Sequence, residues 1–141
     1  MIHPPYPCLW FDGKAQEAAE YYCTIFEDSK ITSTNQIVTM FELNGTTFMA
    51  LNGGPMYTFT PATSFVINCD TQEEIDYYWD KLGDGGKYSR CGWLYDKYDV
   101  SWQIVPTILS TLMSGSNSQK VVEAFMKMNK FDLATLQKAG E

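Results

Sequence analysis

The sequence predicts an α+β fold in which one strand–helix unit occurs twice. The first copy is LWFDGKAQEAAEYYCTIF, Leu9 to Phe26, where an apolar run meets a tight turn at Asp12-Gly13 and is followed by apolar residues at helical spacing. The second copy is a strand pattern over Ser64–Asp70 with a helical stripe over Ile75–Leu82. Internal repetition of this kind predicts two similar halves that share one core.

Length and composition are those of one globular domain. The chain has 141 residues, of which 45% are apolar and 15% aromatic, which is enough to bury a core without disulfide or metal support. We expect a single domain over 1–141, with one module over about 1–60, a second over about 61–106 and a helical tail over 107–141.

Charge and cysteine usage exclude several classes of partner. The formal net charge is -7 and no run of Lys or Arg occurs, which argues against nucleic acid and anionic membranes as partners. No apolar run approaches the roughly 18 residues of a membrane span, and the N-terminus does not resemble a secretion signal. The only histidine is His3, and the four cysteines are evenly spread without a C-x-x-C pair. We expect a cytoplasmic protein with reduced thiols and no zinc site; a secreted protein with two disulfides is the rival interpretation.

In the first half we expect strands near Cys8–Phe11, over Lys30–Leu43 with a break near Ser33–Asn35, and over Thr46–Leu51. Asp12 is expected to cap the first helix. Asn44-Gly45 predicts a type I′ hairpin, because both central residues of that turn need positive φ. A linker over 56–63 joins the halves.

In the second half Thr71 and Glu74 predict a capping box at the start of the helix. Tyr88–Tyr95, a turn over 96–99 and Val100–Val105 are expected to form strand, turn and strand. The tail is expected to hold a short helix over 107–113, a helix capped by Ser116 and a last helix that starts at Asp132.

Four stretches resemble a known family: LWFDGKAQEAAEYYCTIF, FMALNGGP, NCDTQEEIDYYWDKL and CGWLYDKYDVSWQIVP. They are similar to the PhnB-like family labelled "3-demethylubiquinone-9 3-methyltransferase". The element order also resembles the vicinal oxygen chelate superfamily of glyoxalase I, extradiol dioxygenases and bleomycin-resistance proteins. Asp99 departs from the family, which usually has glycine before Val-Ser-Trp-Gln, but Asp tolerates a left-handed backbone.

The resemblance implies a glyoxalase-like α+β fold: two βαβββ modules that form a cupped mixed sheet, followed by C-terminal helices. It also implies a ligand site on the concave face and, often, a homodimer. The positions where metal-dependent members carry His or Glu fall near Tyr6 or Pro7, Met49 or Ala50, Thr63 or Ser64, and Gln103. None of these is a usual transition-metal ligand, so we expect no metal and no cofactor. The methyltransferase label has no support from a Gly-rich nucleoside-binding turn.

Five side chains are candidates for ligand binding. Gln103 is expected to face the cup, where its amide could orient a polar ligand group; the alternative is an amide satisfied by neighbouring backbone or water. The aromatic candidates are Trp10, Phe48, Trp93 and Trp102. They could line an apolar cup, and packing in the core is the alternative for each. Cys91, next to Arg90, is a weaker candidate for a reactive thiol.

From these observations we expect a metal-independent protein that binds a small organic molecule as a homodimer, with no reaction assigned. Two alternatives stay open. One is a metal-dependent lyase, isomerase or dioxygenase, and the other is a protein that sequesters a drug or metabolite without chemistry.

Overall fold

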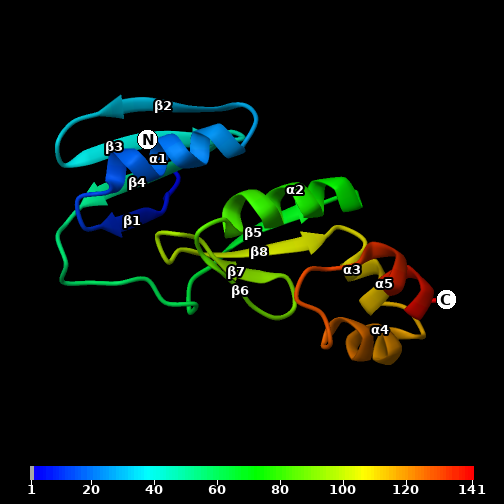
Figure 1. Ribbon diagram of the computed structural model, residues 1–141. Helices are drawn as coiled ribbons and strands as arrows, with labels where there is room; N and C mark the ends of the chain where they lie inside the picture. The colour runs from blue at the N-terminus through cyan, green and yellow to red at the C-terminus, as the bar shows by residue number, and fades with distance from the viewer. Residues whose placement is uncertain (1) are drawn as a thin grey trace. The chain divides into compact units, whose positions relative to one another are not determined.

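The computed structural model describes residues 2–141 and divides the chain into two compact units, one that ends at Phe59 and one from Thr60 to Glu141. The first unit (blue to cyan in Figure 1) contains β1 (Cys8–Phe11), α1 (Ala15–Ile25), β2 (Ser29–Thr34), β3 (Val38–Leu43) and β4 (Thr46–Asn52). The second (green to red) contains β5 (Phe65–Cys69), α2 (Gln72–Gly83), β6 (Lys87–Tyr88), β7 (Trp93–Tyr95), β8 (Ser101–Pro106), α3 (Leu109–Met113), α4 (Ser118–Phe125) and α5 (Leu133–Ala139).

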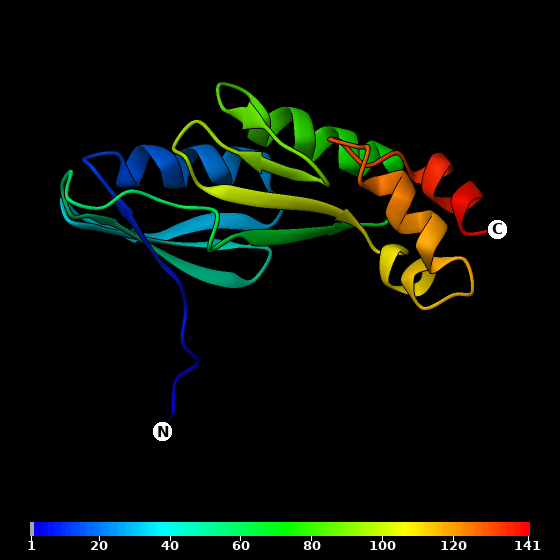
Figure 2. The same cartoon turned by 90° about the horizontal axis from the view of Figure 1, so that it is seen from below.

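Each unit contains one four-stranded sheet, and the two sheets have the same topology. The strand orders are β1-β4-β3-β2 and β5-β8-β7-β6. In each sheet the first pair is parallel and the other pairs are antiparallel. This repetition confirms the predicted glyoxalase-like α+β fold of two βαβββ modules, and the C-terminal helices follow the second module (Figure 2).

The first unit has its core between α1 and one face of its sheet. The small side chains of Ala15, Ala18 and Ala19 are fully buried and let the helix lie close to the strands. Next to them Tyr22 stacks on Phe41, with ring centroids 6.1 Å apart, and Phe41 stacks on Phe48 at 5.3 Å. Aromatic packing therefore joins helix and sheet.

The expected Asp12 cap of the first helix is wrong. The helix begins at Ala15, its N-cap residue is Lys14, and no side-chain cap bond is made there. Gly13 has a φ of 75°, so the chain turns sharply between Asp12 and the helix. The N–H of Ala15 instead donates to Oδ1 of Asn52 at 2.8 Å, from the end of β4.

The predicted hairpin is confirmed. Asn44 and Gly45 have φ values of 50° and 85°, and Leu43 pairs with Thr46 across the turn. The break between β2 and β3 falls at residues 35–37, slightly later than expected. The predicted capping box is also present, since the N–H of Glu74 donates to Oγ1 of Thr71 at 3.2 Å.

The expected single strand over Tyr88–Tyr95 is wrong. It is divided into β6 and β7 by a turn at Ser89–Gly92, where Cys91 has a φ of 57° and Gly92 a φ of 81°. Two successive left-handed residues reverse the chain, so β6 and β7 pair with each other as a short hairpin.

The turn between β7 and β8 is organised around the buried carboxylate of Asp96. Its Oδ1 accepts the N–H groups of Tyr98 at 2.8 Å and Val100 at 3.0 Å, and its Oδ2 accepts the indole N–H of Trp102 at 2.9 Å. Asp99 has a φ of 68°, so the residue that replaces the family's glycine adopts the left-handed conformation.

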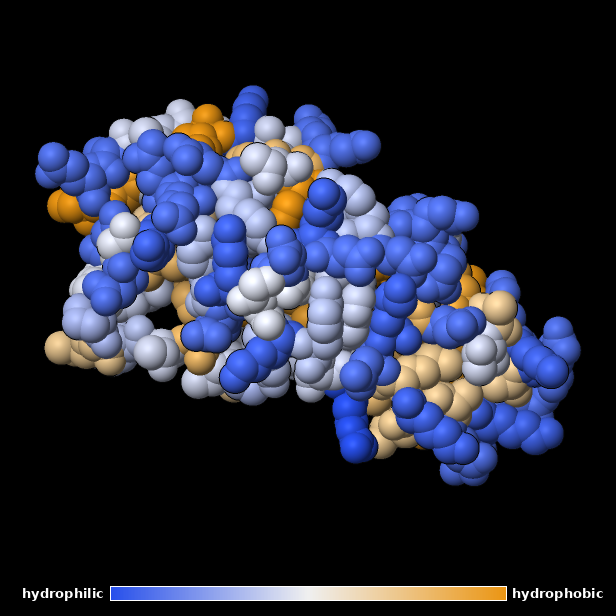
Figure 3. All heavy atoms as spheres, viewed as in Figure 1, coloured by the Kyte–Doolittle hydropathy of each residue, from blue (hydrophilic) through white to orange (hydrophobic). Residues whose placement is uncertain are grey.

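The tail packs as a small helical layer, with α3 and α5 both against α4. Asp132 caps α5 as expected, because its carboxylate accepts the N–H of Thr135 at 3.0 Å. The expected Ser116 cap is wrong: Asn117 is the N-cap of α4 and makes no side-chain cap bond. Met113 and Met126 are exposed, and Figure 3 shows moderately hydrophobic atoms among hydrophilic ones over this part of the chain. Within residues 2–141, no helix is long and apolar enough to cross a membrane.

Replacing Asp96 by Asn should destabilise the fold. The amide N–H groups of the new asparagine would face N–H groups that the carboxylate of Asp96 now accepts. The variant should therefore lose about 2–3 kcal/mol of unfolding free energy in chemical denaturation. Asp80→Asn, on the exposed part of α2, is the matched control. Equal stability of both variants would contradict the role given to Asp96.

Cys69 should be unreactive in the folded protein. Burial, followed by the charges of Glu74 and Asp70, raises the pKa of Cys69 to about 12. At about pH 8.5 its thiolate is therefore scarce, and iodoacetamide should label it only after unfolding. Mass spectrometry of peptides gives the extent of labelling, with the exposed Cys8 as the internal comparison. Labelling of Cys69 before Cys8 in the native protein would contradict this.

Candidate functional site

The sheet of the second unit has one face covered by α2 and an opposite face that we call the open face. In β8, Trp102, Ile104 and Pro106 are buried, and α2 packs against β7 and β8. Because side chains alternate along a strand, Ser101 and Gln103 lie on the opposite side. By the strand register, the open face carries Val66 and Asn68 of β5, Ser101, Gln103 and Val105 of β8, Trp93 and Tyr95 of β7, and Lys87 of the edge strand β6.

Gln103 and Ser64 form a polar pair at this face. Nε2 of Gln103 donates to Oγ of Ser64 at 2.9 Å. In the register, Gln103 also lies between Val66 of β5 and Trp93 of β7. The resemblance places two metal-ligand positions of the superfamily near Thr63 or Ser64 and at Gln103, and the structure brings Ser64 and Gln103 within hydrogen-bonding distance. In this chain these positions carry a neutral hydroxyl and a neutral amide instead of a histidine or a glutamate.

Ser101 is a further polar group on the open face, and the sequence analysis missed it. Its side chain is 1% exposed, and its hydroxyl has no hydrogen-bond partner among the described residues. A buried hydroxyl without a partner costs free energy, so a natural example needs an explanation. Strand alternation could have identified it: Ser101 and Gln103 are two residues apart in Val-Ser-Trp-Gln, so their side chains lie on the same face of the strand.

The equivalent positions of the first sheet are less polar. The parallel pair Cys8–Met49 corresponds to Val66–Gln103, so Tyr6 and Met49 correspond to Ser64 and Gln103. Tyr6 is exposed, whereas Ala50, the other residue considered at the Met49 position, is fully buried in the core. No hydrogen bond corresponding to the Ser64–Gln103 bond joins Tyr6 and Met49.

The superfamily's metal does not fit these residues. The four equivalent positions carry a phenol, a thioether, a hydroxyl and an amide, none of which is a charged or imidazole ligand. Over residues 2–141, no group of three or more His, Cys, Asp or Glu is arranged to hold a metal ion. We therefore derive no chemistry through a metal.

The five predicted site residues lie on different sheets and on different faces of those sheets. Trp93 and Gln103 are neighbours across β7 and β8 on the open face. Trp10 is on the first sheet, on the face away from α1, and its indole N–H donates to the carbonyl of Gly54 at 2.8 Å. Phe48 and Trp102 are 6% and 3% exposed, on the helix side of their sheets.

The thiol of Cys91 is directed at the C-terminal tail. It donates to the carbonyl of Phe125 at 3.6 Å and lies 3.9 Å from the sulfur of Met126. These contacts place it against the end of α4.

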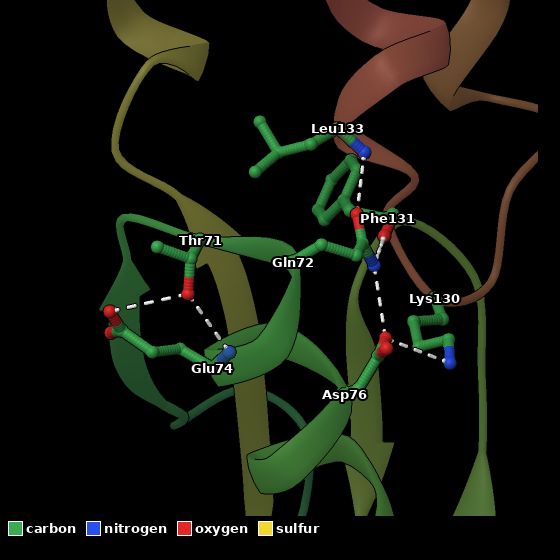
Figure 4. Close-up of polar contacts among 7 residues, drawn as sticks. All are labelled: Thr71, Gln72, Glu74, Asp76, Lys130, Phe131 and Leu133. Carbon is green, nitrogen blue, oxygen red and sulfur yellow. Dashed lines mark hydrogen bonds and ion pairs between the residues drawn. The ribbon is translucent and has the colours of Figure 1, made fainter.

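A groove of about 520 Å³ lies between α2 and the start of α5, and the sequence analysis did not anticipate it. Gln72, Asp76, Lys130 and Phe131 contribute to its lining (Figure 4). Lys130 and Asp76 are 3.0 Å apart. The hydrogen bond from Gln72, and then Lys130, lower the pKa of Asp76, and Asp76 in turn raises the pKa of Lys130. The polar groups of the groove largely bind one another.

Comparisons with known proteins agree with this architecture. A family model described as 3-demethylubiquinone-9 3-methyltransferase matches residues 5–105. A PhnB protein from Bacillus cereus with the same methyltransferase description is 34% identical; the match covers 74% of this chain and 100% of that chain, with a TM-score of 0.69.

More distant structures share the fold. A protein from Pseudomonas aeruginosa is 16% identical over 74% of this chain and 98% of its own, with a TM-score of 0.62. The fosfomycin resistance protein FosX from Listeria monocytogenes, described in complex with Mn(II) and sulfate, is 14% identical over 81% of this chain and 98% of its own, with a TM-score of 0.60. No curated protein matches the chain. The family match and the Bacillus cereus structure together show that the chain belongs to the PhnB-like 3-demethylubiquinone-9 3-methyltransferase family.

Proposed function

We propose that this protein binds an uncharged small organic molecule on the open face of the second sheet, without a metal ion. Ser64, Ser101 and Gln103 would bind the polar groups of the ligand, and Trp93 would contact its apolar part. The observation that carries the proposal is the buried, unpartnered hydroxyl of Ser101 on the same face as the Ser64–Gln103 pair.

The lack of charged side chains on β5, β7 and β8 supports an uncharged ligand beside Gln103. β5, β7 and β8 contribute only apolar, hydroxyl, amide and aromatic side chains to the open face. A carboxylate, phosphate or ammonium group bound beside Gln103 would lose hydration without a neighbouring opposite charge, because the cation of this face, Lys87, is on the edge strand β6, two strands away from β8. The net charge of -7 further disfavours anions.

The available hydrogen-bonding groups favour a ligand that both donates and accepts. One N–H of Gln103 is used by Ser64, which leaves the amide oxygen and a second N–H of Gln103 for a ligand. Ser101 can donate or accept. A hydroxyl-substituted aromatic ring has matching groups, and its ring could pack against Trp93.

Binding without acid–base chemistry is the simplest role for this face. General acid–base catalysis requires a group whose pKa lies near the working pH, and serine hydroxyls and glutamine amides do not titrate there. We therefore propose a binding role, which includes the sequestration of a metabolite or drug.

Removal of single polar groups should weaken ligand binding. With catechol as the probe, Ser101→Ala and Gln103→Ala should each lower the affinity about three- to tenfold, the equivalent of one net hydrogen bond. Ser101→Ala should leave the melting temperature unchanged or raise it, because it removes an unpaired buried hydroxyl. Nuclear magnetic resonance titrations, followed at the indole signal of Trp93, measure both the affinity and the location of binding.

Ser116→Ala, in an exposed loop of the tail, is the matched control and should bind catechol like the unaltered protein. Benzoate and benzylamine carry the same ring with a negative or a positive charge, and both should bind more weakly than catechol. Unchanged catechol affinity in Ser101→Ala, or tighter binding of either charged probe, would contradict the proposal.

We also propose that the protein is a cytoplasmic homodimer. Exposed apolar side chains such as Ile37 and Tyr57 are available for an interface, and all four cysteines are free thiols, as in a reducing compartment. Sedimentation equilibrium should give twice the mass of the chain. A monomer at every concentration tested would contradict the dimer.

A further inference from the structure

The tail of residues 107–141 lies beyond the family match, which ends at residue 105. The tail nevertheless makes specific contacts with the second module, through α2 and through the turn between β6 and β7.

The first contact is made by the side chain of Gln72, the first residue of α2. Its Nε2 donates to the carbonyl of Phe131 at 3.0 Å, and its Oε1 accepts the N–H of Leu133 at 2.8 Å (Figure 4). The amide thus bonds both a backbone acceptor and a backbone donor of the segment that leads into α5. This is the pairing that a neighbouring peptide group would make.

The side chain of Gln72 is also held in place by a hydrogen bond to Asp76 of the same helix. Nε2 also donates to Oδ1 of Asp76, one helical turn further along α2, at 3.0 Å. Lys130 pairs with the same oxygen from the tail side. Both members of this ion pair are substantially exposed, so solvent screens it and the Gln72 bonds are the more specific part of the contact.

The second contact fixes the turn between β6 and β7. The N–H of Cys91 donates to the carbonyl of Met128, and the N–H of Gly92 donates to the carbonyl of Asn129, both at 2.8 Å. The ring of Phe131 lies directly over Gly92, where a Cβ would be 2.5 Å from it. Only glycine fits at this point, and the tail therefore closes over the turn.

The turn leads directly to the open face. The carbonyl of Gly92 accepts the N–H of Ile104 at 2.7 Å, next to Gln103 in β8. The next residue along the chain is Trp93, which pairs with Gln103. A series of hydrogen bonds joined by short stretches of the covalent chain therefore runs from Gln72, through Phe131 and the preceding tail carbonyls, to the turn that comes directly before Trp93.

We propose that Gln72 is a positioning residue for the ligand site: it fastens the tail to α2, and the fastened tail holds the Cys91–Gly92 turn so that Trp93 stays beside Gln103. This inference rests on the proposed function only for the claim that Trp93 contacts a ligand. The mechanical coupling from Gln72 to the turn is a property of the protein without ligand.

Hydrogen exchange on the full chain tests the coupling. In Gln72→Ala, the amides of Leu133, Cys91 and Gly92 should exchange about tenfold faster, the factor that corresponds to one lost hydrogen bond, and the indole signal of Trp93 should shift. The amide of Glu74, bonded to Thr71 at the start of the same helix, should keep its protection. Gln137→Ala, which alters the same groove at a side chain outside this hydrogen-bond series, is the matched control and should change none of these signals.

Gln72→Glu is the second variant, should the alanine variant not fold. It keeps an oxygen for Leu133 but places a carboxylate oxygen against the carbonyl of Phe131 and the carboxylate of Asp76, so it should show the same pattern at least as strongly. Faster exchange at Leu133 with unchanged protection of Cys91 and Gly92 would overturn the proposal, because the tail would then have been loosened without effect on the turn.

Catechol affinity separates this inference from the proposed function. If the unaltered protein binds catechol, Gln72→Ala should weaken binding although Gln72 is not on the open face; unchanged affinity would overturn the positioning role. If the unaltered protein does not bind catechol, the proposed ligand class fails, and the exchange pattern still decides whether Gln72 controls the turn.

Discussion

Three N–H groups at the turn between β7 and β8 donate hydrogen bonds to one buried carboxylate, that of Asp96. One of them belongs to Trp102, so the same group that shapes the turn also holds the indole on the α2 side of the sheet. Because side chains alternate along a strand, Ser101 and Gln103 must then lie on the open face. A slip of one residue would expose Trp102 and bury Gln103 against the helix, at the cost of the Asp96 bonds. The chemistry of the open face thus depends on an interaction on the other side of the strand.

The two units show how one topology can carry different surfaces. Both have the same strand order and one helix over one face, yet equivalent positions carry Tyr6 and Met49 in the first unit and Ser64 and Gln103 in the second. Neither pair offers the charged or imidazole ligands of a transition-metal site. A fold shared with a fosfomycin resistance protein described in complex with Mn(II) therefore does not bring metal chemistry to these residues, and the part of the open face around Ser64 and Gln103 is neutral and hydrogen-bonding.

Features set by neighbouring residues could be predicted from the sequence: the Asn44-Gly45 turn, the Thr71–Glu74 capping box and the repeated module order. Features set by distant residues could not. Asn52, far along the chain, replaces Asp12 as the partner of the helix start. The turn that interrupts Tyr88–Tyr95 is held by carbonyls of the tail, and no local pattern reports those contacts. The aromatic candidates were chosen by residue type; strand parity, which separates Trp93 from Trp102, would also have found Ser101.

The central claim is that the second sheet binds a neutral organic ligand without a metal, and a native mass spectrum of freshly purified protein tests it most directly. The account predicts that any mass carried through purification is organic and that Ser101→Ala or Gln103→Ala reduces its occupancy. A stoichiometric transition metal that is lost in Gln103→Ala would contradict the account, because the amide would then be part of a coordination site.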